Sequence, residues 1–433
     1  MGRDLRPPDL SISALADRIT RAARWLRENE TISVGGGFVV LCGLIVAGYL
    51  AVRRPPDVSD PSATFIAAPQ EVKDLGGDWP FYGLTPSRTR YLPAKVRPPY
   101  ERVWTYKAKA LMEFSPIYAE GRVYGENNDA ELFALDAETG KPDWKRKIGS
   151  LNASSPAYED GVIYAATLQP GSVVALDADS GKTLWKRSMP DRVESSPVVA
   201  NDRVFIGSED GVLRALNTKN GAVSWSARLS GAIKAAPALV DGVLYVGDYG
   251  GAMSAVNAKD GGIKWSTGSQ GSSFGRTGRF YSTPAVIFGR VYIGNVDGRV
   301  YSFEASSGDI AWTRTLGGFV YAAPAVADTP KTPPTVYIGS YGGRFYALDA
   351  RNGSVRWQID ARGRVNGAAT VIGEIVYFAS LDHPRGAVAV RASDGHQVWQ
   401  FSTGAYNPII SDGNRLFLTG YKTVAGLKEY GSD

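Results

Sequence analysis

The sequence SSPVVANDRVFIGSEDGVLRALNTKNGAVSW, from Ser195 to Trp225, contains three short apolar runs and a fourth that carries Trp225. The first three runs end at Asn201-Asp202, Asp210-Gly211 and Asn220-Gly221. Asp-Gly and Asn-Gly between β-branched runs are strong hairpin signals, because glycine accepts the positive φ that such turns need. The stretch therefore predicts one up-and-down antiparallel sheet of four strands.

Variants of this stretch fill most of the chain, and tryptophan marks their period. The repeated tryptophans are separated by 40 to 47 residues: Trp104, Trp144, Trp185, Trp225, Trp265, Trp312, Trp357 and Trp399. A four-stranded unit of this length cannot bury both of its faces alone, whereas radial packing of several copies covers the faces and leaves only short edges. The period therefore predicts an all-β fold, a β-propeller.

The number of blades follows from the incomplete copies at the two ends. Seven units are complete between Ser115 and Trp399. An eighth begins at 407–410 and stops without its tryptophan strand, while an unassigned strand, 101–106, precedes the first unit. We therefore expect an eight-bladed β-propeller of four-stranded antiparallel blades, with the N-terminal strand closing the last blade as its outermost strand.

The residues that recur in every unit have structural explanations. We expect each repeated tryptophan to act as a wedge between neighbouring blades, since it supplies a large apolar area. The glycine four or five residues before it allows positive φ in the turn. Asp136, Asp177 and Asp349 resemble a set of carboxylates, but they share one repeat position. Capping of their own turns explains them better than catalysis does.

The turn sequences before the tryptophans, such as ALDAETGKPDW and ALDADSGKTLW, resemble the pyrroloquinoline-quinone (PQQ) propeller repeat. The resemblance covers about Trp79 to Tyr430. One branch of this family contains the quinoprotein alcohol dehydrogenases, and another contains non-enzymatic propellers such as BamB, the lipoprotein of outer-membrane β-barrel assembly. It implies the fold strongly and leaves the activity open.

The two branches differ in the site that they imply. The dehydrogenase branch implies PQQ beside calcium, a disulfide between adjacent cysteines and an aspartate base, but this chain contains a single cysteine, Cys42. We therefore expect the BamB-type branch, with no catalytic residue, no cofactor and no metal. A dehydrogenase that binds PQQ with calcium is the alternative, and a ligand-sensing propeller is a third interpretation.

Positions that vary among the repeats are the candidates for function. Three residues before the opening proline position, six units carry polar or aromatic side chains, and three arginines stand two residues earlier. Because the first strand of a blade lines the central channel, we expect all of them around one channel mouth, as a rim that binds a partner or a ligand. Ordinary variation of the rim is the alternative. The nine residues are Glu113, Arg192, Glu194, Lys234, Arg279, Tyr281, Tyr321, Arg364 and Asn366.

The N-terminal part predicts a membrane anchor. We expect residues 1–30 to form an amphipathic cytoplasmic tail, the uncharged residues 31–52 to form a transmembrane helix, 53–75 to be a proline-bearing linker, and 76–433 to be the propeller. Six arginines before the apolar segment favour a cytoplasmic N-terminus and an extracytoplasmic propeller. The alternative is a cleaved signal peptide.

The charge pattern limits the kind of partner. After Arg54 there are 40 basic and 38 acidic residues, with no basic run. A nucleic-acid-binding protein concentrates positive charge on one face, so we expect no nucleic-acid binding. The expected partners are other envelope or membrane proteins, bound by a monomeric propeller.

Overall fold

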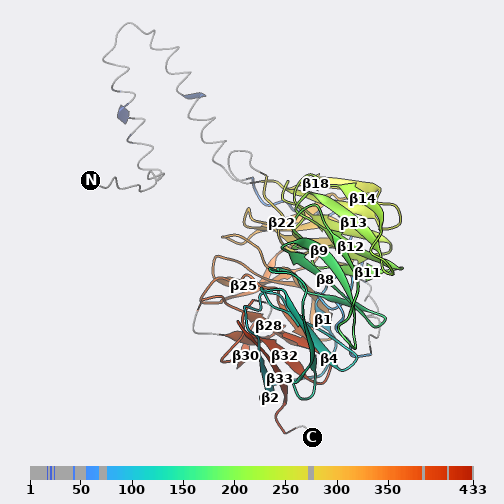
Figure 1. The fold of residues 1–433 in the computed structure, drawn as a ribbon. Helices are drawn as coiled ribbons and strands as arrows, with labels where there is room; N and C mark the ends of the chain where they lie inside the picture. Colours follow the sequence, from blue (N-terminus) through green and yellow to red (C-terminus); the bar gives the residue numbers. More distant parts are fainter. Residues whose placement is uncertain are drawn as a thin grey trace, which may run out of the picture. The chain divides into compact units, whose positions relative to one another are not determined.

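The computed structural model describes residues 17, 20, 21, 24, 42, 43, 55–67, 76–271, 277–382, 386–406 and 409–431. Most of the expected cytoplasmic tail and of the expected span at 31–52 lies outside these residues. Among the described residues, no helix is both long and apolar enough to cross a bilayer. Residues 56–271 and 277–433 form one compact unit, and it is described here by itself (Figure 1).

The described residues of this unit form eight sheets, each with four antiparallel strands, so the prediction of eight four-stranded blades is confirmed. The strands of blades one to four are β3 (Ile117–Ala119), β4 (Arg122–Glu126), β5 (Glu131–Asp136), β6 (Pro142–Lys147); β7 (Ala157–Glu159), β8 (Val162–Leu168), β9 (Gly171–Asp177), β10 (Thr183–Ser188); β11 (Val198–Ala200), β12 (Arg203–Gly207), β13 (Val212–Asn217), β14 (Val223–Arg228); and β15 (Ala238–Val240), β16 (Val243–Gly247), β17 (Ala252–Asn257), β18 (Ile263–Gly268).

Blades five to eight repeat this order. Their strands are β19 (Ala285–Ile287), β20 (Arg290–Gly294), β21 (Arg299–Glu304), β22 (Ile310–Thr315); β23 (Ala325–Thr329), β24 (Thr332–Gly339), β25 (Arg344–Asp349), β26 (Val355–Asp360); β27 (Thr370–Ile372), β28 (Ile375–Ala379), β29 (Ala387–Arg391), β30 (Gln397–Gln400); and β31 (Ile409–Ser411), β32 (Leu416–Thr419), β33 (Thr423–Glu429), β2 (Tyr100–Lys107). A short strand, β1 (Tyr91–Leu92), adds to blade seven in parallel with β27.

The last blade is built from both ends of the propeller. β2 pairs antiparallel with β33, from Tyr100 opposite Glu429 to Lys107 opposite Thr423 (Figure 1). This confirms that the N-terminal strand is the outermost strand of blade eight. Closure removes the open edge that an incomplete eighth blade would leave.

The repeated tryptophans join neighbouring blades. Seven indole N–H groups donate to a backbone carbonyl of the next blade, over 2.6 to 3.0 Å, from Trp104, Trp144, Trp185, Trp225, Trp265, Trp312 and Trp357. Each of these rings also packs on the turn glycine of that blade, as Trp144 does on Gly181. Trp399 meets blade eight differently, because no turn joins the third and fourth strands of that blade, β33 and β2. Its ring lies edge-on to the Tyr100 ring, with 6.0 Å between the centroids.

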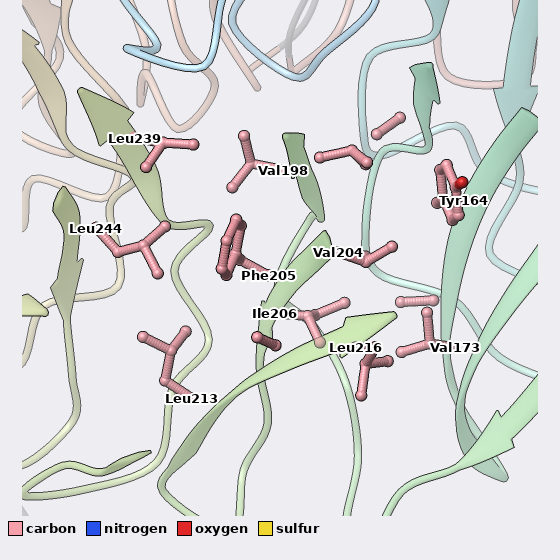
Figure 2. Packing of buried hydrophobic residues seen from close by; sticks show 14 of the residues in the cluster. Tyr164, Val173, Val198, Val204, Phe205, Ile206, Leu213, Leu216, Leu239 and Leu244 are labelled. Carbon is pink, nitrogen blue, oxygen red and sulfur yellow. The ribbon is translucent and has the colours of Figure 1, made fainter. Parts of the chain in front are cut away.

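The core lies between the blades. Figure 2 shows one cluster in which Phe205 and Ile206 of β12 lie among side chains of blades two and four, including Val173 and Leu239. Successive apolar residues of a strand point to opposite faces, so each blade contributes to two such interfaces.

A segment before β2 closes part of the channel, and we call residues 79–92 the plug. Its backbone carbonyls accept hydrogen bonds from the innermost strands of four blades: Pro86 from Leu239, Ser87 from Val286, Thr89 from Val326, and Arg90 from Val371, over 2.8 to 2.9 Å. Arg88 is fully buried, and its guanidinium donates to the carbonyls of Pro237 and Pro197, each at 3.0 Å. The plug therefore satisfies backbone groups that would otherwise face an open channel.

Residues 57–66, which we call the strap, run along blade five from its outermost strand, β22, to the turn between β19 and β20. Ser59 pairs antiparallel with Trp312 of β22, and Thr313 N–H donates to the Val58 carbonyl at 3.0 Å. Farther along, the Ile66 N–H donates to the Phe288 carbonyl, also at 3.0 Å. Part of the segment expected as a linker thus extends the sheet of blade five.

Candidate functional site

The candidate site is formed by the segments that connect one blade to the next. Each segment leaves an outermost strand, passes the rim and enters the next innermost strand. Lys234 and Tyr281 stand five residues before Leu239 and Val286, whose amides donate to the plug. The rim side chains therefore lie above the plug because each stands a fixed number of residues before an innermost strand that bonds to the plug.

Six of the nine expected rim residues surround one hollow, which we call the cup. Its volume is about 520 Å³, including its open mouth. These six are Glu113, Glu194, Lys234, Tyr281, Tyr321 and Asn366. The others around it, which sequence analysis did not single out, are Tyr82, Phe114, Ser196, Ala236, Thr283, Gly367 and Tyr406. Tyr82 belongs to the plug, so the plug contributes to the cup.

The three arginines of the expected rim are absent from the lining of the cup. Arg364 forms an ion pair with Asp382 at 2.9 Å. The guanidinium of Arg279 lies 5.4 Å from the centroid of the Tyr249 ring. Arg192 is exposed, and its carbonyl accepts a hydrogen bond from the Glu209 N–H at 2.9 Å.

Lys234 is the ammonium group of the cup, and two carboxylates share it. Its Nζ lies 2.5 Å from Glu194 and 3.1 Å from Glu209. Burial raises the pKa of Glu194 even though Lys234 opposes that rise. Burial by itself would lower the pKa of Lys234, but its bonds to the two carboxylates raise it above the ordinary value. Lys234 is therefore held as a cation at neutral pH.

Aromatic side chains extend from the cup along blades four to six. The Tyr281 and Tyr321 rings are perpendicular with centroids 5.5 Å apart, and Tyr321 lies 4.9 Å from Tyr341. Tyr249 lies 6.1 Å from Tyr281, and Phe319 lies 5.7 Å from Tyr321. Phe319 is 52% exposed. We call Tyr249, Tyr281, Phe319, Tyr321 and Tyr341 the aromatic sector.

One sequence signal could have found part of this sector. Tyr249 and Tyr341 occupy the same repeat position, in the turn between the second and third strands of their blades, within VGDYGG and IGSYGG. Glu209 occupies that position in blade three. The position varies among blades as the rim does, but nothing local in the sequence shows that these turns reach the rim.

The donor groups of the cup do not fit PQQ. This cofactor carries three carboxylates on a planar ring system, whereas Glu113 and Glu194 line the cup and Lys234 is already bonded to two carboxylates. The carboxylates of PQQ would therefore be repelled by those of Glu113 and Glu194 inside the cup. Separately, within the described residues no group of three His, Cys, Asp or Glu side chains is placed to hold a metal ion.

Comparison with known families and structures agrees with the fold. The family model described as outer membrane protein assembly factor BamB matches residues 100–169, 149–329 and 329–429. Among curated protein sequences, none matches this chain.

Two solved structures represent the two branches. A quinohemoprotein alcohol dehydrogenase from Pseudomonas putida is 14% identical with a TM-score of 0.69, covering 86% of this chain and 84% of that one. BamB from Moraxella catarrhalis is 17% identical with a TM-score of 0.64, covering 76% of this chain and 100% of that one. At such identities the likeness shows the fold alone.

Proposed function

Since this chain belongs to the PQQ-like β-propeller family whose model is described as outer membrane protein assembly factor BamB, we propose that it is a membrane-anchored scaffold of the cell envelope. In this proposal the extracytoplasmic propeller binds other envelope or membrane proteins through the cup and the aromatic sector, without catalysis. The propeller acts as a monomer and does not bind nucleic acid.

The observation that carries the proposal is the composition of the rim. Tyrosine, phenylalanine and arginine are enriched in protein interfaces, and the aromatic rings supply large contact areas at low entropic cost. Here Phe319 is half exposed beside Tyr321 and Tyr341, and Arg364 lies 5.7 Å from the Tyr341 ring. An exposed ring on a rigid scaffold is suited to enter a pocket of a partner.

The position of the strap favours the proposal that the partner lies at the membrane. Asp57 accepts hydrogen bonds from the Thr315 N–H and hydroxyl, at 3.0 and 2.8 Å, and lies 3.6 Å from Arg299 at the start of β21. The turn before β21 is the counterpart in blade five of the turns that carry Tyr249 and Tyr341. The chain therefore enters the propeller on the face that carries the aromatic sector. The uncharged residues 31–52 precede this point by only a few residues.

Crosslinking from the rim tests the proposal. A photo-reactive amino acid in place of Phe319 should crosslink the full-length protein to a discrete envelope protein in intact cells. The same group in place of Leu184, which is 54% exposed on β10, is the matched control and should give none. Absence of a crosslink from position 319, with the protein present in the membrane fraction, would contradict the scaffold function.

The likeness to a quinohemoprotein alcohol dehydrogenase gives the second candidate, a PQQ-dependent dehydrogenase. Titration of the purified protein with PQQ and calcium, followed by absorbance and by dye reduction with alcohols, separates the two. Because carboxylates line the cup, we expect neither stoichiometric binding nor turnover. Binding with turnover would replace the scaffold proposal.

A further inference from the structure

The cup combines aromatic rings with carboxylates around one hollow. Five rings line it, and they come from the plug and from the segments that enter blades one, five, six and eight: Tyr82, Phe114, Tyr281, Tyr321 and Tyr406. The faces of aromatic rings carry partial negative charge and attract cations. Two carboxylates, Glu113 and Glu194, stand among these rings.

Carboxylates outnumber ammonium groups among the side chains that line the cup. Lys234 is bonded to Glu194 and Glu209, so one ammonium group serves two carboxylates. Glu113 accepts a hydrogen bond at 3.2 Å from the side-chain amide of Asn128, which is a neutral donor. Two carboxylates and one ammonium group thus line the cup, and Glu209 lies beyond the lining as the second partner of Lys234.

Arginines near the cup do not line it. Arg279 lies on the Tyr249 ring, 5.4 Å from its centroid. Arg88 and Arg90 lie beneath, in the plug, and neither lines the hollow. The Arg88 guanidinium is used by backbone carbonyls, and that of Arg90 is stacked on the Tyr82 ring at 3.9 Å. Arg364 is paired with Asp382 outside the cup.

The pKa values of two tyrosines that line the cup are raised by its carboxylates. Burial raises the pKa of Tyr281, and the charges of Glu194 and Glu113 raise it further. Burial also raises the pKa of Tyr406, again with a contribution from Glu113. The carboxylates thus act on rings from opposite parts of the rim, and these phenols remain neutral at physiological pH.

We propose that the cup binds an alkylammonium or guanidinium group, supplied by a lysine or arginine side chain of the partner protein. The inference rests on the proposed function, because it names the chemistry by which the scaffold would hold its partner. The rings would surround the cation, and Glu113 would accept its hydrogen bonds. Charge-assisted bonds of this kind are stronger than neutral ones, particularly where water is excluded.

Peptide binding to the full-length protein in detergent tests the inference. The probe is the blocked pentapeptide Ala-Ala-Lys-Ala-Ala, and its matched control carries norleucine in place of lysine. Calorimetry should show binding of the lysine peptide alone, weakened about tenfold between low and high salt. Spermidine, tested in parallel, distinguishes the sources: tighter binding of the peptide assigns a protein partner, and tighter binding of spermidine overturns that assignment.

Three variants locate the interaction. Glu113→Gln should weaken binding of the lysine peptide about tenfold, because it removes one charge-assisted bond. Lys234→Met should tighten it several-fold, since the competing ammonium group is gone. Glu138→Gln, an exposed carboxylate in the turn before β6, is the control and should change nothing. Circular dichroism confirms that each variant is folded.

Equal affinity for the lysine and norleucine peptides, or an unchanged affinity in Glu113→Gln, would overturn the inference. These outcomes are distinct from failure of the scaffold function. If position 319 crosslinks a partner in cells while Glu113→Gln leaves the peptide affinity unchanged, the scaffold function stands and the cation site falls. If no crosslink forms, the scaffold function itself is contradicted.

Discussion

At the scale of single residues, the turn glycines satisfy two separate requirements. Gly181 has φ of 64°, in the left-handed region that disfavours other residues. A Cβ at this position would also lie 2.6 Å from the Trp144 ring. Gly161, in the same blade, has φ of 77° but open space around the position of a Cβ. Alanine substitutions at Gly161 and Gly181 therefore distinguish backbone strain alone from backbone strain combined with steric overlap.

We expect Gly181→Ala to destabilise the protein more than Gly161→Ala. Gly161→Ala should cost about 1 kcal/mol from backbone strain. Gly181→Ala should cost about 1–3 kcal/mol more, because the new methyl group displaces the indole. Denaturant unfolding of both variants measures the difference. Equal losses would show that the contact with Trp144 contributes nothing.

Glu126 is an exception within the repeat. It is buried at a position that is glycine in blades three to six, at Gly207, Gly247, Gly294 and Gly339. Among the described residues, neither of its carboxylate oxygens has a hydrogen-bond partner. Burial raises its pKa well above the ordinary value, so the folded protein holds this carboxyl group protonated.

This burial predicts a pH dependence of stability. In the unfolded chain Glu126 loses its proton near its ordinary pKa, and in the folded chain it keeps the proton to higher pH. The unfolded state then binds fewer protons, so stability falls as pH rises above about 4.5. Glu126→Gln should flatten this fall between pH 5 and 8 in denaturant unfolding, and the exposed Glu138→Gln should not. Parallel profiles for wild type and Glu126→Gln would contradict the assignment.

At the scale of elements, the strap shows how a segment without a repeat pattern joins the fold. Its polar and proline-containing sequence has no apolar period, yet its backbone pairs with the free edge of β22. Phe65 adds side-chain packing, with its ring 5.4 Å from Phe288 and the Arg351 guanidinium 5.0 Å from its centroid. Edge strands accept such pairing because their outer N–H and C=O groups are unused.

Phe65→Ala should release the strap without unfolding the blades. The variant loses the packing on Phe288 while the closure through β2 and β33 is untouched, so limited proteolysis between residues 56 and 67 should accelerate several-fold at an unchanged melting temperature. Ile66→Ala, whose side chain is 53% exposed, is the neighbouring control and should behave as wild type. Unchanged cleavage in Phe65→Ala would show that backbone pairing alone holds the strap.

At the scale of the whole molecule, the ring is closed by hydrogen bonds between its two ends. β2 and β33 belong to opposite ends of the propeller sequence and complete one blade. Glu101 is paired with Lys428 across these strands, and their side chains form an ion pair at 3.3 Å. Residues so placed point to the same side of the sheet and are suited to a covalent crosslink.

The double variant Glu101→Cys/Lys428→Cys, in a Cys42→Ser background, should therefore stabilise the ring when oxidised. Loop-closure entropy gives an upper limit of about 5–6 kcal/mol for so long a loop, and strain in the disulfide reduces it. The melting temperature of the oxidised protein should exceed that of the same protein in reductant. If the pairing of β2 with β33 does not limit unfolding, the oxidised and reduced proteins will have equal melting temperatures.

The sequence by itself determined the ring. Hairpin signals and the tryptophan period are local and repeated, so eight blades and the closing role of the strand at 101–106 could be predicted without coordinates. The expected rim positions followed from their offset to the innermost strands, and six of those side chains lie around the cup. The expected span at 31–52 and its orientation stay predictions.

Only the tertiary structure decided how non-repeated segments use that ring. The plug and the strap have no periodic pattern, because each is stabilised by edges and channel groups that exist only once the blades are assembled. Tyr82 enters the cup from the plug, and Tyr249 and Tyr341 join the aromatic sector from turns far apart in the sequence. A repeat specifies the contacts that recur between neighbouring blades. A site on the propeller axis depends on how the blades differ from one another, and these differences come together only in the assembled ring.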